Sequence, residues 1–173
     1  AEKIIINNGF ENLTKHLAAT GGTLIDKKYH FNLVRIGMAL YGCREGFKPI
    51  LSWFTVISEI KKLKIGDFVG YDLTEKINRS MKMAILPIGY WHGFDRGLTR
   101  IGEISIKNKL ARVLGRVSMD MTAVDVSKIN CKVGDKATII GPKNSAINMA
   151  NKINTSPYEI VTRINPLIKK IYK

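Results

Sequence analysis

Apolar and polar residues alternate with a period of two through most of the middle of the chain. This alternation puts every second side chain on one face and is typical of half-buried β-strands. Strands of this kind are expected at residues 52–63, 66–71, 80–90, 102–115 (a hairpin), 116–128 and 134–141. The runs are short, and Gly-Asp turns separate several of them, so the pattern predicts an antiparallel barrel or sandwich.

The front of the chain has a different pattern. Residues 31–42, "FNLVRIGMALYG", are almost continuously apolar, which is typical of a parallel strand buried on both faces. Arg35 lies in the middle of this run and would need an acceptor there, because an unpaired buried charge is very costly. A single strand of this type has no sheet to join, so we interpret the front as the end of an α/β domain that begins outside this chain.

The last thirty or so residues have helical patterns. One short amphipathic helix is expected at 145–153 and a second at 156–164. Ser156, Pro157 and Glu159 form a capping-box sequence at the start of the second helix. The sequence therefore predicts a mainly β fold, an antiparallel β domain with a helical tail, preceded by the last elements of an α/β domain.

Composition narrows the class of protein. The chain has 173 residues and a net charge of +14, with 28 Lys and Arg against 14 Asp and Glu. The lysines are scattered and no arginine-rich tract occurs, which favours a solvated basic surface over a nucleic-acid-binding arm. Cys43 and Cys131 lack metal-site or disulfide spacing and suggest free thiols in a reducing compartment. No apolar segment reaches the roughly 20 residues of a membrane span, so we expect a cytoplasmic protein without a membrane partner.

Several short stretches could carry chemistry, although each also has a purely structural interpretation. "AATGGT" at 18–23 is either a turn or a close approach of the backbone to an anion. Arg35 could be a structural arginine paired with a carboxylate, and Tyr71 a packing residue. "GYWHGFDRG" at 89–97 could be a loop that closes a barrel, and Asp120 an exposed strand position. The three histidines are too dispersed to predict a metal site.

The order and spacing of these motifs are more specific than any one of them. "LVRIGMALYG", "GDFVGYDL", "LPIGYWHGFDRGL", "VLGRVSMDMTAVDV" and "SPYEIVTRI" follow one another along the chain. In this arrangement, residues 15–173 resemble the C-terminal part of alanine racemases. These isomerases use pyridoxal 5'-phosphate to interconvert L- and D-alanine and supply D-alanine for peptidoglycan. The related serine racemases share the pattern, which leaves the amino-acid substrate open.

The resemblance implies a fold and an assembly. Alanine racemases combine an N-terminal eight-stranded α/β barrel of TIM type, which holds the cofactor, with a mostly β C-terminal domain. Residues 1–50 would then be the end of the barrel and residues 51–173 the β domain. The family forms head-to-tail homodimers in which the barrel of one subunit and the β domain of its partner share each active site. This implies a small-molecule substrate and no nucleic-acid partner.

The resemblance also assigns cofactor-binding residues. Thr20, Gly37, Met38 and Tyr158 match residues that contact the cofactor phosphate. Arg35 matches the arginine that donates a hydrogen bond to the pyridine nitrogen. Because a guanidinium keeps its proton, the nitrogen stays unprotonated and the ring is a weaker electron sink.

Racemisation requires a proton to leave one face of the substrate Cα and another to arrive on the opposite face. The family uses a lysine and a tyrosine for these two steps, and Tyr71 matches the tyrosine, acting in the partner's site. Met119 matches the residue whose backbone contacts the substrate carboxylate, and Tyr90 and Asp120 match residues of the entrance channel. His92 stands where the family usually has an aspartate, and the sequence assigns no role to it.

No lysine of this chain matches the lysine that binds the cofactor covalently. We therefore expect the chain to be part of a longer racemase and to be inactive alone. Two alternatives remain open at this stage. One is a non-catalytic basic barrel that binds nucleic acid, with Trp53, Phe54 and Trp91 as stacking platforms. The other is a dimerisation or regulatory domain that keeps the racemase scaffold without activity.

Overall fold

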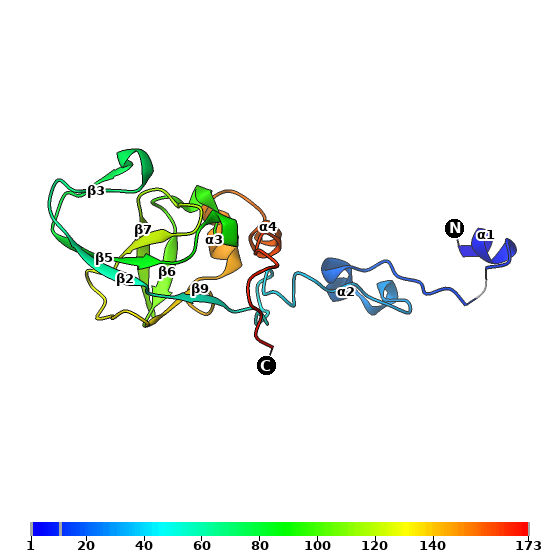
Figure 1. Ribbon diagram of the computed structural model, residues 1–173. Coiled ribbons are helices and arrows are strands. Elements are labelled where there is room, and N and C mark those ends of the chain that lie inside the picture. Colours follow the sequence, from blue (N-terminus) through cyan, green and yellow to red (C-terminus); the bar gives the residue numbers. More distant parts are fainter. Residues whose placement is uncertain (1, 11, 173) are drawn as a thin grey trace.

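An antiparallel β-barrel forms the main body of the protein (Figure 1). The structure, a computed structural model, describes residues 2–10 and 12–172. Seven strands form one sheet in the order β1-β9-β6-β7-β8-β5-β2, and β3 and β4 form a separate two-stranded sheet. The strands are β1 Trp53–Val56, β2 Glu59–Leu63, β3 Phe68–Val69, β4 Glu75–Lys76, β5 Met81–Leu86, β6 Glu103–Ile106, β7 Lys109–Leu114, β8 Thr122–Asp125 and β9 Lys136–Ile140.

A bent strand closes the barrel. β1 and β2 lie at the two edges of the sheet, yet only Ile57 and Ser58 separate them in the chain. The N–H of Ile57 donates to the carbonyl of Asp135 at 3.0 Å, and the N–H of Ser58 donates to the carbonyl of Ile85 at 2.9 Å. The chain thus leaves β9 and joins β5 within two residues, which removes the open edges of the sheet. Of the two architectures that the alternation allowed, the barrel is the one observed.

The barrel interior is apolar. Leu86, Ile104, Val113, Val124 and Ile139 have no exposed surface and belong to one continuous core cluster. They come from five different strands, as expected when alternate side chains of each strand point inward. A smaller cluster lies on the outer side of the barrel, where the β3–β4 hairpin packs over it; its buried members are Val69, Ile77, Met81, Met83 and Leu114.

One predicted element of the barrel is confirmed, and another is shorter than predicted. The hairpin at 102–115 is confirmed as β6 and β7, and Lys107 and Asn108 have positive φ angles of 48° and 62°, as a tight hairpin turn requires. The strand at 116–128 is shorter than predicted, because β8 begins only at Thr122. The residues before it, Met119 and Asp120, lie in an exposed bend.

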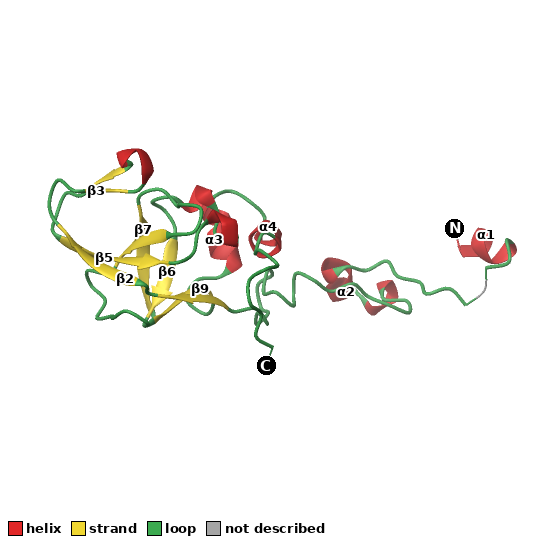
Figure 2. Ribbon diagram, in the orientation of Figure 1, coloured by secondary structure: helices red, strands yellow, loops and turns green. Residues whose placement is uncertain are grey.

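Helices cover one end of the barrel (Figure 2). α3 is Ala146–Lys152 and α4 is Pro157–Thr162, and each contributes buried side chains to the core cluster. The Ser156 hydroxyl caps α4 by accepting from the N–H of Tyr158 at 3.2 Å. Glu159 accepts from Arg163 at 3.0 Å, so the predicted N-cap is confirmed and the Glu159 carboxylate is engaged one turn further along.

The front of the chain extends away from the barrel (Figure 1) and contains α1 Glu2–Asn7, α2 Thr20–Ile25 and the 3-10 helix η1 Lys27–Tyr29. The predicted buried strand at 31–42 is wrong for this structure. Among the described residues, the strand-type pairing of this segment is a single parallel bridge between Ala19 and Arg35, and Leu33 and Leu40 are exposed. A parallel strand needs neighbouring strands and covering helices, and the front segment offers it one short partner.

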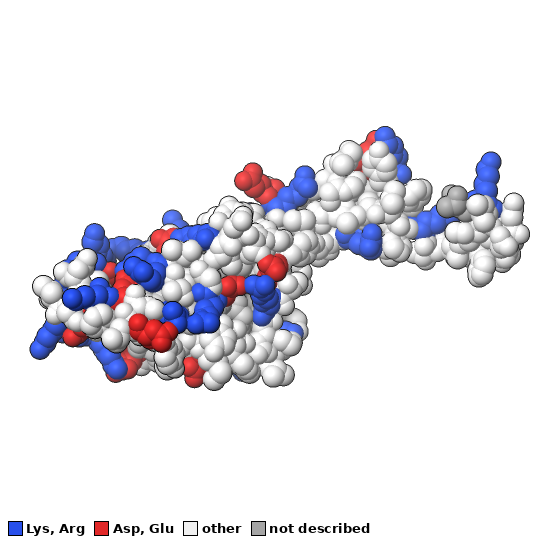
Figure 3. Space-filling view, turned by 90° about the horizontal axis from the view of Figure 1, so that it is seen from above, with Lys and Arg blue, Asp and Glu red and all other residues white. Residues whose placement is uncertain are grey.

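Charge and hydropathy add two observations. On the face shown in Figure 3, lysines and arginines are interspersed with acidic side chains over the barrel and form no continuous basic patch. None of the helices formed by residues 2–10 and 12–172 is both long and apolar enough to cross a membrane.

Candidate functional site

Tyr71 lies in a strained turn beside the barrel. The turn, residues 70–75, is called the Tyr71 turn here and includes the 3-10 helix η2 Tyr71–Leu73. Asp72 and Leu73 have left-handed φ angles of 57° and 51°, which are unfavourable for residues other than glycine. The Tyr71 side chain is 64% exposed. It is therefore available to a molecule that docks against this face.

Close backbone contact attaches the start of the Tyr71 turn to the barrel. Gly70 has a φ of 85°, and a Cβ at this position would lie 2.5 Å from the backbone nitrogen of Arg116. A Cβ on Gly115 would similarly lie 2.4 Å from the carbonyl oxygen of Val69. The guanidinium of Arg116 pairs with Asp72. Only glycines allow the two backbones to approach this closely.

A buried carboxylate attaches the other end of the turn. Glu75 is 8% exposed and accepts from Arg112 at 2.5 and 3.4 Å and from the N–H of Gly115 at 2.7 Å. Arg100 lies 3.9 Å away. Burial raises the pKa of Glu75, but the hydrogen bonds from Arg112 and Gly115 and the charges of Arg112 and Arg100 outweigh it, so the pKa lies below its ordinary value.

Acid should weaken this anchor. Because the folded-state pKa of Glu75 is lowered, its stabilising contribution is complete above the ordinary glutamate value of about 4.3 and is lost as the pH falls through the folded-state value. We expect the free energy of unfolding in urea to decrease between about pH 5 and pH 3. The decrease should be smaller in Glu75→Gln, whereas Glu59→Gln, an exposed residue paired with Lys61, should match the wild type. Equal slopes for all three proteins would contradict this expectation.

The loop that contains Tyr90 is attached to the same part of the barrel. The 3-10 helix η3 Tyr90–His92 follows Gly89, whose Cβ, if present, would lie 2.2 Å from the carbonyl oxygen of Ser118. The N–H groups of Tyr90 and Trp91 donate to the carbonyls of Ser118 and Met119 at 3.0 and 2.9 Å. Tyr90 and Met119 are both about half exposed. Segments 70–75 and 89–92 therefore meet residues 115–119, as their order in the sequence suggested.

His92 has a structural role that the sequence did not reveal. Its Nδ1 accepts a hydrogen bond from the N–H of Gly89 at 3.2 Å, which closes the turn around Tyr90. The His92 carbonyl accepts from the N–H of Asn165 at 3.1 Å, and the Asn165 side chain donates to the carbonyl of Trp91. His92 thus links the Tyr90 loop to the C-terminal segment.

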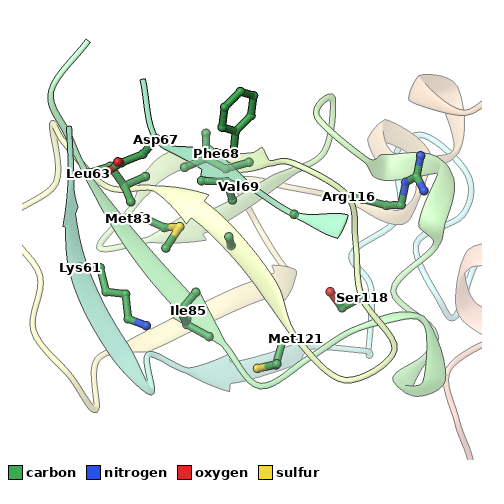
Figure 4. Close-up of a pocket in the computed structure, with 13 residues that line it drawn as sticks. Lys61, Leu63, Asp67, Phe68, Val69, Met83, Ile85, Arg116, Ser118 and Met121 are labelled. Atoms are coloured by element: carbon green, nitrogen blue, oxygen red, sulfur yellow. The ribbon is translucent and has the colours of Figure 1, made fainter. Parts of the chain in front are cut away.

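Two cavities adjoin these loops. The first, of about 480 Å³, lies between the β3–β4 hairpin and the outer face of the barrel (Figure 4). Met83, Ile85 and Met121 line its apolar wall, and Arg116 and Ser118 line the side near the Tyr71 turn. The second, of about 540 Å³, is lined by Tyr90, Gly93, Asp95, Arg96 and Arg163.

A second group of candidate residues lies where the front segment meets α4. The N–H of Gly37 donates to the hydroxyl of Thr20 at 3.2 Å, and Thr20 is 3% exposed. The Tyr158 hydroxyl lies 2.7 Å from where a Cβ on Gly37 would be, and Met38 packs against the core cluster. Thr20, Gly37, Met38 and Tyr158 are called the phosphate cradle below. The Gly37 N–H and the Thr20 hydroxyl are hydrogen-bonded to each other, and the Tyr158 hydroxyl lies against Gly37, so the types of polar group that bind a phosphate are gathered at this point.

Arg35 lies close to the cradle in sequence but is not buried. Its backbone N–H donates to the carbonyl of Ala18 at 2.9 Å, and its guanidinium donates to the carbonyl of Leu17 at 3.4 Å. The side chain is exposed. The expectation that Arg35 is buried is therefore wrong, and the guanidinium remains accessible to a ligand.

The two groups of residues do not form one site within a single chain. β3, which precedes the Tyr71 turn, and α2, which begins with Thr20, lie far apart along the molecule, with the rest of the barrel and α4 between them (Figure 1). Each group is a partial site: Tyr71, Tyr90, Arg35 and Tyr158 are exposed, whereas Thr20 is buried.

Comparisons with known proteins cover almost the whole chain. Residues 50–172 match the family described as alanine racemase, C-terminal domain, and residues 3–45 match alanine racemase, N-terminal domain. The chain belongs to the alanine racemase family. It is 34% identical to the alanine racemase of Leptospira interrogans and 33% identical to that of Rickettsia akari, in both cases over 94% of this chain and 47% of the relative.

Solved structures agree with the fold. The alanine racemase of a D-cycloserine-producing Streptomyces lavendulae has a TM-score of 0.85 and 28% identity, over 95% of this chain and 47% of that one. The alanine racemase of Bartonella henselae, with covalently bound pyridoxal phosphate, has a TM-score of 0.84 and 27% identity, over 99% of this chain and 50% of that one. The chain thus spans about half the length of the relatives it matches.

Glu75 is the residue of this region that sequence reasoning missed. In "DLTEKIN" it resembles an ordinary surface charge. Its partners Arg112 and Gly115 lie about forty residues further along. One weak signal was available in the sequence. Glu75 closely follows the candidate Tyr71, and Ile77, two positions after Glu75 and therefore on the same face of a strand, is an apolar residue that the structure buries.

Proposed function

We propose that this chain supplies about half of a pyridoxal 5'-phosphate-dependent alanine racemase that interconverts L- and D-alanine. Family membership and relatives named alanine racemase support this function. The Bartonella henselae structure, with its covalently bound pyridoxal phosphate, supports the cofactor. Residues 1–50 belong to the cofactor-binding barrel in this proposal, and residues 51–173 form the β domain.

Residues of the front segment and α4 bind the cofactor. The hydroxyls of Thr20 and Tyr158 and the backbone at Gly37 and Met38 hold its phosphate, and the exposed guanidinium of Arg35 donates to its ring nitrogen. The bound cofactor makes the Cα–H of the amino acid acidic enough to be removed. Arg35 limits this effect, because it donates a hydrogen bond without giving up its proton.

Residues around the barrel act on the substrate. Tyr71 exchanges a proton with the substrate Cα on one face, and its exposure allows it to reach into another subunit. The backbone of Met119 holds the substrate carboxylate, and Tyr90 and Asp120 narrow the access route. The backbone hydrogen bonds between the Tyr90 loop and residues 118–119 keep these groups in fixed relative positions.

The separation of the two partial sites is the observation that carries the proposal of a homodimer. Because the Tyr71 turn and α2 lie far apart in one molecule (Figure 1), a single copy cannot bring Tyr71 to a cofactor held by Thr20. A second copy, arranged head to tail, completes each site. Free thiols at Cys43 and Cys131 are compatible with a cytoplasmic enzyme.

A joined enzyme tests the function. In it, this chain replaces the matching 47% of the Leptospira interrogans racemase; this protein is called the joined racemase below. We expect it to dimerise, to bind pyridoxal 5'-phosphate with a visible absorbance band, to racemise alanine, and to support growth of a D-alanine auxotroph. The 173-residue chain alone should neither racemise alanine nor support growth of the auxotroph. A folded joined racemase that binds the cofactor without racemising alanine would refute the proposal.

Gly37→Ala tests the phosphate cradle. The new Cβ would displace the Tyr158 hydroxyl, which is the free end of a side chain, so the fold should tolerate it while cofactor affinity falls about tenfold. Titration of the joined racemase with pyridoxal 5'-phosphate measures this loss. In a Tyr158→Phe background, the same substitution should cost little more, because the displaced hydroxyl is already absent. Full additivity of the two losses would contradict this explanation.

The nucleic-acid-binding alternative is not favoured. Trp53 is 6% exposed and belongs to the core, so it cannot stack on a base. The Nζ of Lys136 lies 4.1 Å from the ring centroid of Phe54 and covers that ring. On the face shown in Figure 3, acidic side chains interrupt the basic ones, so this face has no continuous basic groove for a nucleic-acid backbone to follow.

A further inference from the structure

The Tyr71 turn needs an anchor that fixes its conformation. Asp72 and Leu73 both have left-handed backbone angles, and such conformations persist only where the surroundings enforce them. The side chains of Tyr71 and Leu73 are each about two-thirds exposed, so their own packing contributes little. Apart from the ion pair between Asp72 and Arg116, the conformation of the turn is therefore set at its two ends.

Both ends are attached to the same pair of residues. At the start, Gly70 lies against the backbone nitrogen of Arg116. At the end, the Glu75 carboxylate accepts from the N–H of Gly115 at 2.7 Å. Both ends of the turn are therefore held by two adjacent residues, Gly115 and Arg116, in the loop that leads to Met119.

The anchor at Glu75 is built for precision more than for stability. Arg112 donates to both carboxylate oxygens and also to the carbonyls of Arg100 and Val113, so its guanidinium is itself held in place. The Glu75 carboxylate is buried, whereas the Arg112 side chain is 43% exposed. The paired hydrogen bonds between the guanidinium and the two carboxylate oxygens fix the direction in which the carboxylate faces.

We propose that Glu75, held by Arg112, is a positioning residue that orients Tyr71 for proton transfer. This inference rests on the proposed function of Tyr71. Glu75 does not touch the substrate; it fixes the end of the turn that carries the phenol. A displacement of about 1 Å in a reacting group can cost about a hundredfold in rate, so loosening the turn has a direct catalytic consequence.

Kinetics of the joined racemase test the catalytic part. Glu75→Gln keeps the shape but places an amide N–H₂ against the donors of Arg112 and Gly115. We expect kcat to fall about 10- to 100-fold with KM changed less than about threefold. In a Tyr71→Phe background, the same change should lower the residual rate less than about twofold, because there is no phenol to misplace. Glu59→Gln, on the exposed end of β2, is the matched control and should retain the wild-type rate.

Hydrogen exchange in the 173-residue chain tests the structural part without any activity. In Glu75→Gln, the amide of Gly115 and those of residues 70–75 should exchange at least about tenfold faster, while those of β6 and β9 keep their wild-type rates. Unchanged exchange in the turn, or an equal increase across the whole barrel, would overturn the proposal. So would full additivity of Glu75→Gln and Tyr71→Phe. A wild-type joined racemase without activity would instead refute the proposed function, and the exchange data would still decide whether Glu75 holds the turn.

Discussion

Tyr71→Phe should lower kcat of the joined racemase by about 10²- to 10⁴-fold, the usual range for loss of a general acid–base group. The substitution removes one oxygen atom from a side chain that is 64% exposed and is not a member of the core cluster. The free energy of unfolding should therefore change by less than about 0.5 kcal/mol. Initial rates in both directions, measured by coupled detection of each alanine enantiomer, give the result.

Solvent isotope exchange sharpens the same experiment. If Tyr71 serves one face of the substrate and the lysine serves the other, the variant should still exchange the Cα hydrogen of one enantiomer with D₂O while no longer forming the other. Tyr172→Phe, at an 87% exposed position near the C-terminus, is the control and should keep the full rate. A Tyr71→Phe enzyme that racemises at the wild-type rate would exclude Tyr71 as the base.

Gly89→Ala should destabilise the protein more than Gly37→Ala or Tyr71→Phe. A Cβ at residue 89 would lie 2.2 to 2.6 Å from backbone atoms of Ser118 and Met119, which cannot move aside as a side chain can. We expect the free energy of unfolding to fall by about 3 kcal/mol, the upper part of the usual range for overpacking. The midpoint of thermal unfolding should fall by about 6–12 °C. Urea unfolding of the 173-residue chain provides the measurement.

Gly21→Ala is the matched control for this clash. Its Cβ would meet no atom within 4 Å, and the residue lies in α2 without a positive φ. Alanine should there be neutral or stabilise the helix by up to about 1 kcal/mol. If Gly89→Ala were as stable as Gly21→Ala, the contact between the Tyr90 loop and residues 118–119 would not be as close as the structure has it.

The elements that local sequence determines were predicted well. The β6–β7 hairpin follows from alternation on both sides of Lys107 and Asn108, and the start of α4 follows from Ser156 and Pro157. The front strand at 31–42 was not predicted correctly. Its apolar pattern describes burial by neighbouring strands and helices, and only the Ala19–Arg35 bridge is present to satisfy it. Periodicity reports which environment a segment suits, and the available partners determine whether it forms.

The candidate site was predicted by type and order of residues, through resemblance to a family. Its assembly depends on contacts that no local pattern encodes. Gly89 approaches Ser118, and Glu75 approaches Gly115, because the barrel brings distant strands together. The role of His92 was missed for a related reason: an imidazole can accept a hydrogen bond where the family usually has a carboxylate, and the sequence alone shows only the change of residue.

The bent strand that closes the barrel also sets an order of events during folding. β1 pairs with β9, so Trp53 finds its partner Ile140 only after nearly the whole barrel has emerged from the ribosome. β2 pairs with β5, and this hairpin-like unit can form much earlier. At a synthesis rate of about 5–20 residues per second, β1 remains unpaired for several seconds. Trp53 and Ile57 are then exposed on a nascent chain, and the late, non-local closure makes this step the slow one in forming the barrel.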